Sequence, residues 1–273
     1  MSKIVPLSDL HVGSLWGLWP PRFEAEDPRT GRTLQFVQND TQRKLWKHWQ
    51  KMVSTIDPDT IILNGDLIDG AQPREGGRGL VTPNIEWQVA ACLQVLETLP
   101  KVPTYCTMGT GYHSMPDGSA AEQWIAKQIG AEFGDELIVE ECGIRLFCRH
   151  VIGASNTAWQ YMTTAPARDQ MLLYLNKSAE KYGPIDYAVF SHRHQFVHTE
   201  FTSGSAIVTP CWQTKTPYAV KKGIITTPDI GWVELNILDK KNIAVDKRGI
   251  EHIERPCKVV GRDRIKQIRG KPK

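Results

Sequence analysis

The chain has 273 residues, 41% of them hydrophobic, and this is enough to enclose a sizeable core. Charged residues make up 23% and the formal net charge is +3, so the overall charge requires neither a nucleic-acid nor a membrane partner. No run approaches the roughly 18 apolar residues of a membrane span, and the N-terminus lacks the apolar core of a signal peptide. Six scattered cysteines without a C-x-x-C pair favour buried, reduced thiols. We therefore expect a protein of the cytoplasm with no membrane partner.

The first half of the chain alternates short apolar runs with segments of helical periodicity. Strands are expected within residues 3–11, 59–69 and 102–109, and helices within 39–56, 84–99 and 119–131. This alternation is typical of an α/β sheet. Ser119 and Glu122 have the spacing of a capping box, which predicts that the third helix begins at Ser119.

Beyond residue 135 the strands come in pairs. Hairpins are predicted within residues 136–153, 196–210 and 231–249, and one helix is predicted at roughly 164–182. An α/β first half joined without a linker to a hairpin-rich second half fits two sheets packed together, with helices outside. We predict one domain over residues 1–257 and a basic tail over 258–273.

Two long segments are predicted to be irregular loops, at residues 13–37 and 70–84. The first carries Trp16 and Trp19, and the second carries Arg74 and Arg78. Such side chains could form an electrostatic track with stacking surfaces for a nucleic acid. The alternative is that the tryptophans pack their loop against the domain.

Five apolar segments end in carboxylate or imidazole side chains. In chain order these are Asp9 and His11, Asp66 and Asp69, His113, His150, and His192 and His194. In an open α/β sheet the strand ends and the loops after them converge on one crevice, so these residues can meet there. Asp9 and His11 are two residues apart, and on extended backbone both side chains would point to the same side. The same applies to His192 and His194.

The chemistry of this set indicates a metal centre. A mixture of carboxylates and neutral imidazoles suits manganese, iron, zinc or nickel, whereas calcium prefers cages made only of oxygen. This many ligands favours two metal ions, with Asp66 able to bridge them. Taken alone, an Asp-x-His triplet arises by chance, and a strand-end histidine is commonly a half-buried structural residue. The interpretation as a metal site is supported because five such strand ends occur in one chain.

The motifs "SDLHVG", "NGDLID" and "SHRHQF", in this order, resemble those of the calcineurin-like metallophosphoesterase superfamily, over roughly residues 4–210. The start "HVGSLWGLWPP" and the turn "GTGYH" look like a subset carried by bacteriophages and prophages. The resemblance implies a four-layer α/β/β/α sandwich, with two mixed β-sheets packed face to face and helices on the outer faces. It also implies a dinuclear centre, with one metal held by Asp9, His11, Asp66 and His194 and the other by Asp66, His150 and His192.

One motif departs from the family pattern. The family usually has Gly-Asn-His followed by an acid, in which the asparagine binds the second metal and the histidine protonates the leaving group. Here Thr110 follows Gly109, His113 comes two positions late, and Ser114 stands where the acid would be. Thr110 is a weaker neutral ligand, and with Arg74 and Arg78 it is a candidate for substrate binding. For His113 two roles stay open, proton donor, which we favour, or replacement ligand.

These features predict a metal-dependent hydrolase of phosphate esters. In this hypothesis two divalent cations, with manganese preferred over iron, zinc or nickel, neutralise phosphoryl oxygens and activate a bridging hydroxide as the nucleophile. His113 protonates the leaving alkoxide, since the ordinary histidine pKa near 6.5 suits an acid at neutral pH. Asp69 orients the Asp66 loop and does not bind metal.

The expected substrate is a phosphate diester, with a nucleic acid or a nucleotide among the candidates. A phosphomonoesterase is the first alternative, and a non-catalytic metal-binding interaction module with the same fold is the second. If a bacteriophage encodes the chain, the protein would act in the host cytoplasm. No oligomeric state is predicted.

Overall fold

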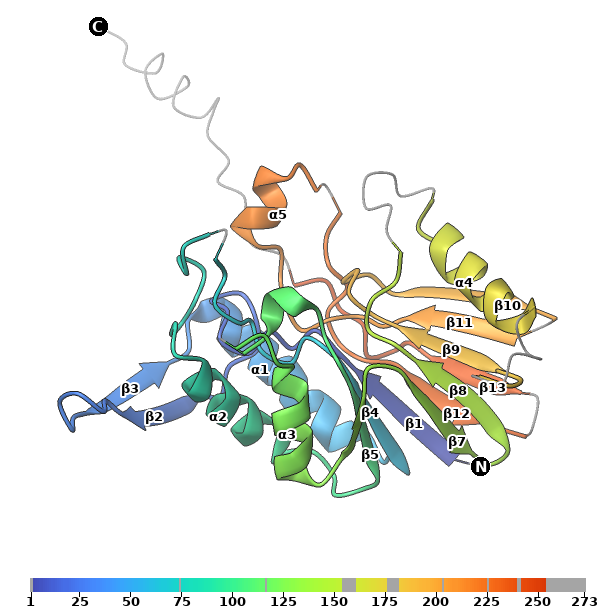
Figure 1. Ribbon diagram of the computed structural model, residues 1–273, viewed down its shortest axis with the longest axis horizontal. Helices are drawn as coiled ribbons and strands as arrows, with labels where there is room; N and C mark the ends of the chain where they lie inside the picture. The colour runs from blue at the N-terminus through green and yellow to red at the C-terminus, as the bar shows by residue number, and fades with distance from the viewer. Residues whose placement is uncertain are drawn as a thin grey trace, which may run out of the picture.

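The computed structural model describes residues 2–73, 75–115, 117–153, 161–175, 182–202, 204–224, 226–239 and 242–253. The chain is built around two β-sheets that lie face to face (Figure 1). The predicted basic tail at 258–273 and the domain boundary at 257 lie outside the described residues.

The first sheet has six strands in the order β13-β12-β1-β4-β5-β6. Four of them run parallel: β1 (Ser2–Leu7), β4 (Thr60–Asn64), β5 (Thr104–Thr107) and β6 (Glu132–Gly134). The hairpin of β12 (Glu234–Ile237) and β13 (Ile243–Asp246) adds to β1 in the antiparallel sense. The carboxyl ends of the parallel strands therefore meet at one edge of the sheet, where ligand sites of α/β proteins form.

The second sheet has five strands in the order β10-β11-β9-β8-β7. Its strands are β7 (Leu137–Glu141), β8 (Ile144–Cys148), β9 (Tyr187–Phe190), β10 (Val197–Phe201) and β11 (Gly204–Val208). β8, β9 and β11 are parallel to one another, and β7 and β10 pair in the antiparallel sense at the two edges. Both sheets are therefore mixed, and all three predicted hairpins are present.

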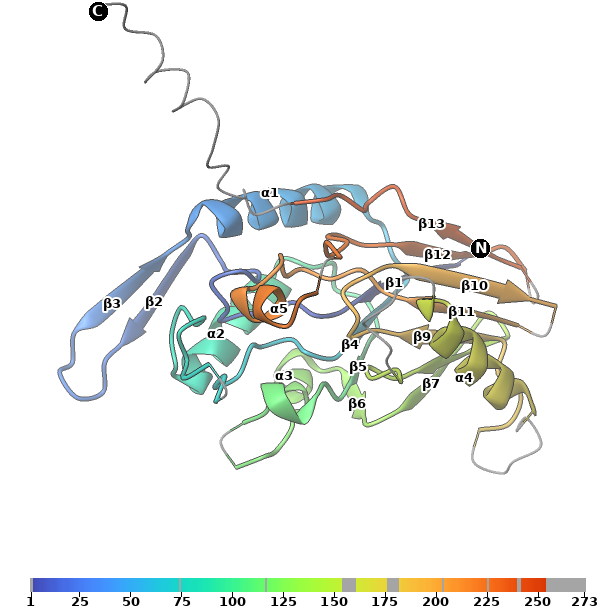
Figure 2. The same ribbon diagram turned by 90° about the horizontal axis from the view of Figure 1, so that it is seen from above.

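Helices cover the outer face of each sheet (Figure 2). The helices over the first sheet are α1 (Asp40–Thr55), α2 (Ile85–Leu96) and α3 (Ala121–Ile129), and α4 (Thr164–Leu175) covers the second. Two short elements complete the set, η1 (Gly111–His113) and α5 (Pro217–Lys221). The predicted four-layer α/β/β/α sandwich is confirmed.

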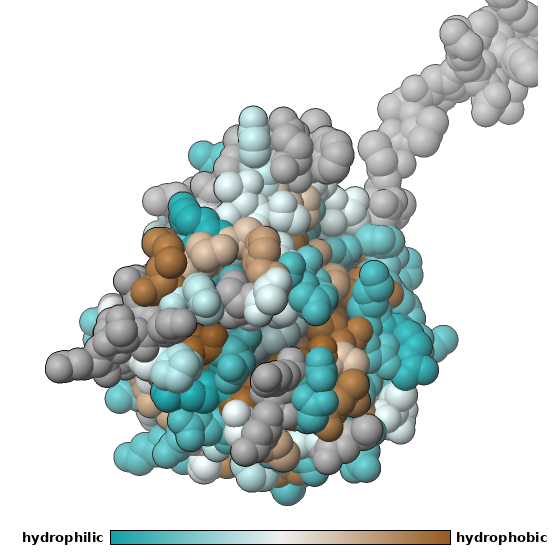
Figure 3. Space-filling view, turned by 90° about the vertical axis from the view of Figure 1, so that its right-hand side faces the viewer, coloured by the Kyte–Doolittle hydropathy of each residue, from teal (hydrophilic) through white to brown (hydrophobic). Residues whose placement is uncertain are grey.

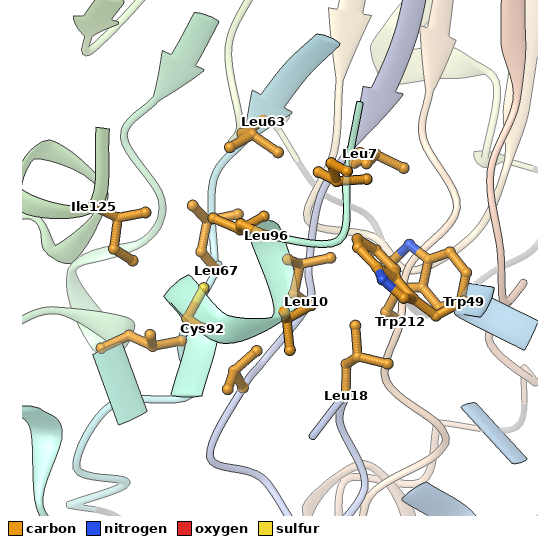
Figure 4. Packing of buried hydrophobic residues seen from close by; sticks show 14 of the residues in the cluster. Leu7, Leu10, Leu18, Trp49, Leu63, Leu67, Cys92, Leu96, Ile125 and Trp212 are labelled. Carbon is orange, nitrogen blue, oxygen red and sulfur yellow. The ribbon is translucent and has the colours of Figure 1, made fainter. Parts of the chain in front are cut away.

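The alternation of side chains in β4 shows how one strand serves two cores. Ile62 belongs to the apolar cluster between the sheets, together with Leu146 and Val189. Ile61 and Leu63 point to the other face and join the cluster under the helices, because successive side chains of a strand alternate. Figure 4 shows Leu63 and Leu7 within this second cluster, beside residues from the helices.

The helix boundaries follow from local chemistry in one case and from tertiary contacts in another. α1 begins with a capping box in which Asn39 and Gln42 bond reciprocally, as its sequence allows. α3 begins after Ala120 without any side-chain cap, so the predicted capping box of Ser119 and Glu122 is wrong. The carboxylate of Glu122 is buried and accepts a hydrogen bond from the backbone N–H of Leu67 at 3.2 Å.

The segment predicted as an irregular loop at 13–37 contains an antiparallel ribbon, β2 (Arg22–Glu26) and β3 (Thr33–Val37), which projects from the body (Figure 1). Trp19 at its base is fully buried. The centroid of its ring lies 5.4 Å from the ring centroid of Phe23 and 6.2 Å from that of Phe36. Trp19 therefore packs the ribbon down, and its prediction as a stacking surface for nucleic acid is wrong.

The surface around α4 mixes apolar with polar side chains (Figure 3). Leu172 and Leu175 on the outer side of α4 are exposed. Within the described ranges, none of the helices is long and apolar enough to cross a membrane. The five described cysteines are free thiols, and four of them are buried.

Candidate metal centre

The five polar strand ends identified in the sequence meet at one place. They follow β1, β4 and β5 of the first sheet and β8 and β9 of the second. Three groups of three potential ligands form there among the described residues. The first is Asp9, His11 and His194, the second is Asp66, His150 and His192, and the third, which shares His11 with the first, is His11, Asp69 and His113.

In the first group, three side chains from opposite sheets surround one point. Asp9 Oδ1 lies 3.2 Å from His194 Nε2 and 3.8 Å from His11 Nε2, and the two Nε2 atoms are 3.1 Å apart. Asp9 and His11 are buried, and His194 is partly exposed. These spacings are those of ligands that could share one ion.

The second group is centred on Asp66. Its Oδ2 atom lies 3.0 Å from His150 Nε2 and 4.0 Å from His192 Nδ1. The two groups adjoin, because His150 Nε2 is also 3.9 Å from Asp9 Oδ1. Asp9 thus lies near histidines of both groups, whereas the histidines near Asp66 are those of the second group and His113.

Hydrogen bonds at Nδ1 set the tautomers of two histidines. His11 Nδ1 is 3.0 Å from a carboxylate oxygen of Asp69, and His150 Nδ1 is 2.6 Å from the carbonyl oxygen of Asn64. Since these oxygens can only accept, each Nδ1 donates a hydrogen and each neutral ring keeps its Nε2 lone pair toward the centre. This is the arrangement usual for histidines that bind metals.

Two buried atoms at the junction have no hydrogen-bond partner among the described residues, Asp9 Oδ1 and His150 Nε2. Buried polar atoms are nearly always paired, so this pair of acceptors calls for a donor or a cation. The residues present therefore fit the divalent ions expected from the sequence.

The electrostatics agree with a site that takes positive charge. Burial would raise the pKa of Asp9, but His150 and His194 outweigh it and hold that pKa well below its usual value. Burial would lower the pKa of His11, but the hydrogen bond with Asp69 and the nearby carboxylate of Asp9 raise it to about 10. In the same way Asp66 and Asp9 raise the pKa of His150 to about 9. Buried carboxylates that stay ionised require positive charge beside them, either from protonated histidines or from metal ions.

The two sequence-adjacent ligand pairs, Asp9 with His11 and His192 with His194, do not converge through the alternation of side chains on extended backbone. β1 ends at Leu7, and Asp9 and His11 both have left-handed backbone with φ of +50° and +46°. His192 and His194 are left-handed as well, with φ of +73° and +56°. The prediction that extended backbone directs each pair to one side is wrong, and tight turns do so instead.

Two glycines allow the close approach of backbone to ligands. A Cβ atom on Gly109 would lie 2.4 Å from Asp66 Oδ1, and one on Gly65 would lie 2.6 Å from the ring of His150. Gly65 also has a φ of +80°. A larger residue at either position would displace a candidate ligand.

His113 stands at the rim of this centre, in η1. Its Nδ1 is 2.7 Å from the carbonyl oxygen of Asp69, and its Nε2 is 3.8 Å from Asp66 Oδ2. The carbonyl of Asp69 therefore orients the imidazole in place of the missing acid. The carboxylate of Asp69 contacts His11, and the role of this residue in orienting the Asp66 loop stays a prediction.

The predicted substrate-binding residues are less closely grouped. Thr110 donates to Asp66 Oδ1 from its backbone N–H at 2.6 Å and from its hydroxyl at 3.1 Å. Arg78 is exposed on the loop at 70–84, and Arg74 lies outside the described residues.

Residues outside the predicted site also contribute to the centre. Asn64 accepts from Thr107 Oγ1 at 2.7 Å and donates to Ser191 Oγ at 2.6 Å, which ties the ends of three strands together. Gln72 and Gln213 both donate to the carboxylate of Asp69. Only Asn64 had a signal in the sequence, its place directly before "GD".

Comparison with protein-family models and with curated proteins finds no match to the chain. Among solved structures it is similar to a predicted phosphoesterase from Streptococcus pneumoniae, at 11% identity and a TM-score of 0.41, covering 90% of this chain and 87% of that one. A structure described as a novel archaeal phosphodiesterase gives 13% and 0.44, covering 89% and 98%. Vps29 from Chaetomium thermophilum gives 10% and 0.45, covering 90% and 96%. Each of these similarities is a distant one between backbone folds.

Proposed function

We propose that this protein is a metal-dependent phosphoesterase of the calcineurin-like type, from the bacteriophage-borne subset, that holds two divalent cations and hydrolyses phosphate diesters. One observation carries the proposal. Two carboxylate–imidazole groups adjoin at Asp9 Oδ1, and this atom and the neighbouring His150 Nε2 are buried without hydrogen-bond partners among the described residues.

Each ligand set takes side chains from both sheets. Asp9, His11 and His194 would hold one ion, and Asp66, His150 and His192 would hold the other. Manganese is the first candidate, and iron, zinc and nickel are also compatible with this mixture of oxygen and imidazole ligands. When bound, the cations supply charge stabilisation for phosphoryl oxygens and an activated water.

The role of His113 is to hold and deliver a proton. Because its Nδ1–H donates to the carbonyl of Asp69, the second proton of the imidazolium sits on Nε2, which faces the centre. From there it can pass to the alkoxide that leaves phosphorus. Positioned proton transfer of this kind contributes about 10²- to 10⁴-fold to a rate.

The substrate class rests on the loops around the centre. Arg78 and Lys222 are exposed, and Lys221 in α5 bonds to Glu75 of the 70–84 loop at 3.1 Å, so these segments lie side by side. Exposed cations beside a metal centre favour a polyanionic diester such as a nucleic acid. Trp19 takes no part, since it is buried.

Turnover of two small esters tests the proposal. We expect manganese-dependent hydrolysis of bis-p-nitrophenyl phosphate, exceeding that of p-nitrophenyl phosphate, and its loss in Asp66→Asn. Asp117→Asn is the matched control, because Asp117 is an exposed acid whose carboxylate, among the described residues, bonds to Ser119 and to no candidate ligand. Chelation should abolish the activity and added manganese should restore it.

The outcomes separate the candidate functions. Preference for the monoester would favour the phosphomonoesterase. Stoichiometric metal binding without turnover of either ester, across several metals, would favour the non-catalytic module. Equal activity of the wild type and Asp66→Asn would contradict a role of this centre in catalysis.

A further inference from the structure

The carboxylate of Asp69 is the centre of a buried network that touches a candidate metal ligand. Its Oδ1 atom is 3.0 Å from His11 Nδ1 and 3.2 Å from Gln213 Nε2, and its Oδ2 atom accepts from Gln72 Nε2. All four residues are buried. A carboxylate that accepts three donors is fixed in rotation and has little remaining capacity to bind an ion.

Each glutamine amide is itself held in one orientation. Gln72 Oε1 accepts the backbone N–H of Gly79 at 3.1 Å, so the NH₂ group of that amide must face Asp69. Gly79 permits this, since a Cβ atom there would lie 2.6 Å from Gln72 Oε1. Gln213 Nε2 also donates to Ser14 Oγ at 3.2 Å, which fixes the second amide.

We propose that Gln72 and Gln213 are positioning residues for the metal centre, which hold Asp69 so that it fixes His11 as the Nδ1–H tautomer with Nε2 toward Asp9. The inference rests on the proposed metal centre and adds to it residues that neither bind the ion nor touch the substrate. Without the two amides, the Asp69 carboxylate can turn away from His11 or enter the ligand shell.

The network also joins the centre to its surroundings. Asp69 follows β4, Gln72 belongs to the loop that carries Arg78, and Gln213 follows β11. The orientation of His11 therefore depends on contacts from three separate segments. Outer partners of metal-binding histidines typically account for about 10- to 100-fold in metal affinity.

A third buried glutamine provides the matched control. Gln88 accepts from the N–H of Gly70 at 2.9 Å and donates to the carbonyls of Gly70 and Thr82. It braces the same loop, and no hydrogen bond joins it to Asp69 among the described contacts. A merely structural role for Gln72 and Gln213 would make their replacement resemble that of Gln88.

The test measures manganese affinity of the full chain by competition with a chromophoric chelator, together with melting temperature. We expect Gln72→Met and Gln213→Met each to weaken one of the two bound ions by about 10- to 100-fold, whereas Gln88→Met lowers the melting temperature and changes affinity less than threefold. Gln72→Glu keeps the acceptor for Gly79 and replaces the donor with a carboxylate that repels Asp69, so at pH 8 it should weaken binding as Gln72→Met does. Nitrogen-15 NMR of the metal-free protein, recorded above the His11 pKa of about 10 so that the ring is neutral, should show the Nδ1–H tautomer of His11 in the wild type and a mixture in these variants.

Two failures are distinguishable. A wild type that binds no divalent metal overturns the proposed function and this inference with it. A wild type that binds two ions, with Gln72 and Gln213 variants that bind them as tightly or that behave as Gln88→Met does, overturns the positioning role alone.

Discussion

At the scale of single residues, the candidate ligands occupy backbone conformations that their side chains disfavour. Seven described residues other than glycine have positive φ, and five of them are Asp9, His11, Asp66, His192 and His194. A sixth is Gln72. Left-handed backbone costs roughly 1–2 kcal/mol per residue, and such strain collects at functional sites. The left-handed backbone that places these ligands at tight turns thus lowers the stability of the metal-free protein.

His192 allows this cost to be measured, because its side chain is about one third exposed (35%) and its replacement leaves no enclosed cavity. Asparagine tolerates left-handed backbone better, so in chelator we expect His192→Asn to be more stable than the wild type by about 0.5–1 kcal/mol in urea unfolding. In manganese the order should reverse as the ligand is lost. His198→Asn, at an exposed position of β10, is the control and should bring no gain. A lower stability of His192→Asn in chelator would contradict the strain argument.

Replacement of His113 distinguishes the two roles that the sequence leaves open for it, proton donor and metal ligand. For a proton donor, His113→Ala should keep two metal ions per chain and lose about 10²- to 10⁴-fold in turnover of diesters with alkyl leaving groups. Turnover of nitrophenyl esters, which leave without protonation, should change much less. Metal content by mass spectrometry and the dependence of rate on leaving-group pKa check this. Loss of one ion per chain would show that His113 is a ligand.

At the scale of elements, the sequence predicts helices and strands that have a long periodic pattern. It does not predict those whose position or boundary is set by tertiary contacts. The apolar face of α1 and the three hairpins follow from periodicity and turns. The β2–β3 ribbon was missed because each of its strands has only five residues, and Phe23 and Phe36 are held by Trp19 from outside the ribbon. The capping box failed because Glu122 serves the N–H of Leu67 and not its own helix.

Trp19 tests how the ribbon is anchored. Because the side chain is fully buried, we expect Trp19→Ala to cost about 3–5 kcal/mol in the free energy of unfolding. Trp19→Phe should cost much less, since it keeps an aromatic ring near Phe23 and removes an indole N–H without a partner among the described residues. Urea unfolding measures both. Equal losses would contradict anchoring by the ring.

At the scale of the whole molecule, the site could be predicted as far as it depends on strand ends. Polar residues after parallel strands meet wherever the sheet places them, so Asp9, Asp66, His150 and His192 could be grouped without a structure. Gln213 could not, because nothing in "CWQT" marks it. Its place depends on the bond from Trp212 N–H to the carbonyl of Asp9, at 3.0 Å, which joins two segments far apart in sequence.

The buried charges of the centre should also appear in the stability of the whole protein. Burial, with repulsion from Asp66, raises the pKa of Glu122 from 4.5 to about 7. Between these values the folded carboxyl keeps a proton that the unfolded one has lost, so this group lowers stability as pH rises. The full difference corresponds to about 3 kcal/mol.

Glu122→Gln keeps the acceptor for Leu67 and removes the titration. In chelator we expect this variant to gain about 3 kcal/mol relative to the wild type between pH 4.5 and 8, by urea unfolding at each pH. Glu86→Gln, an exposed glutamate in the first turn of α2, controls for the change of charge alone. Parallel profiles for the wild type and Glu122→Gln would contradict a raised pKa. Manganese should reduce the difference, because a cation beside Asp66 offsets the negative charge that helps to keep Glu122 protonated.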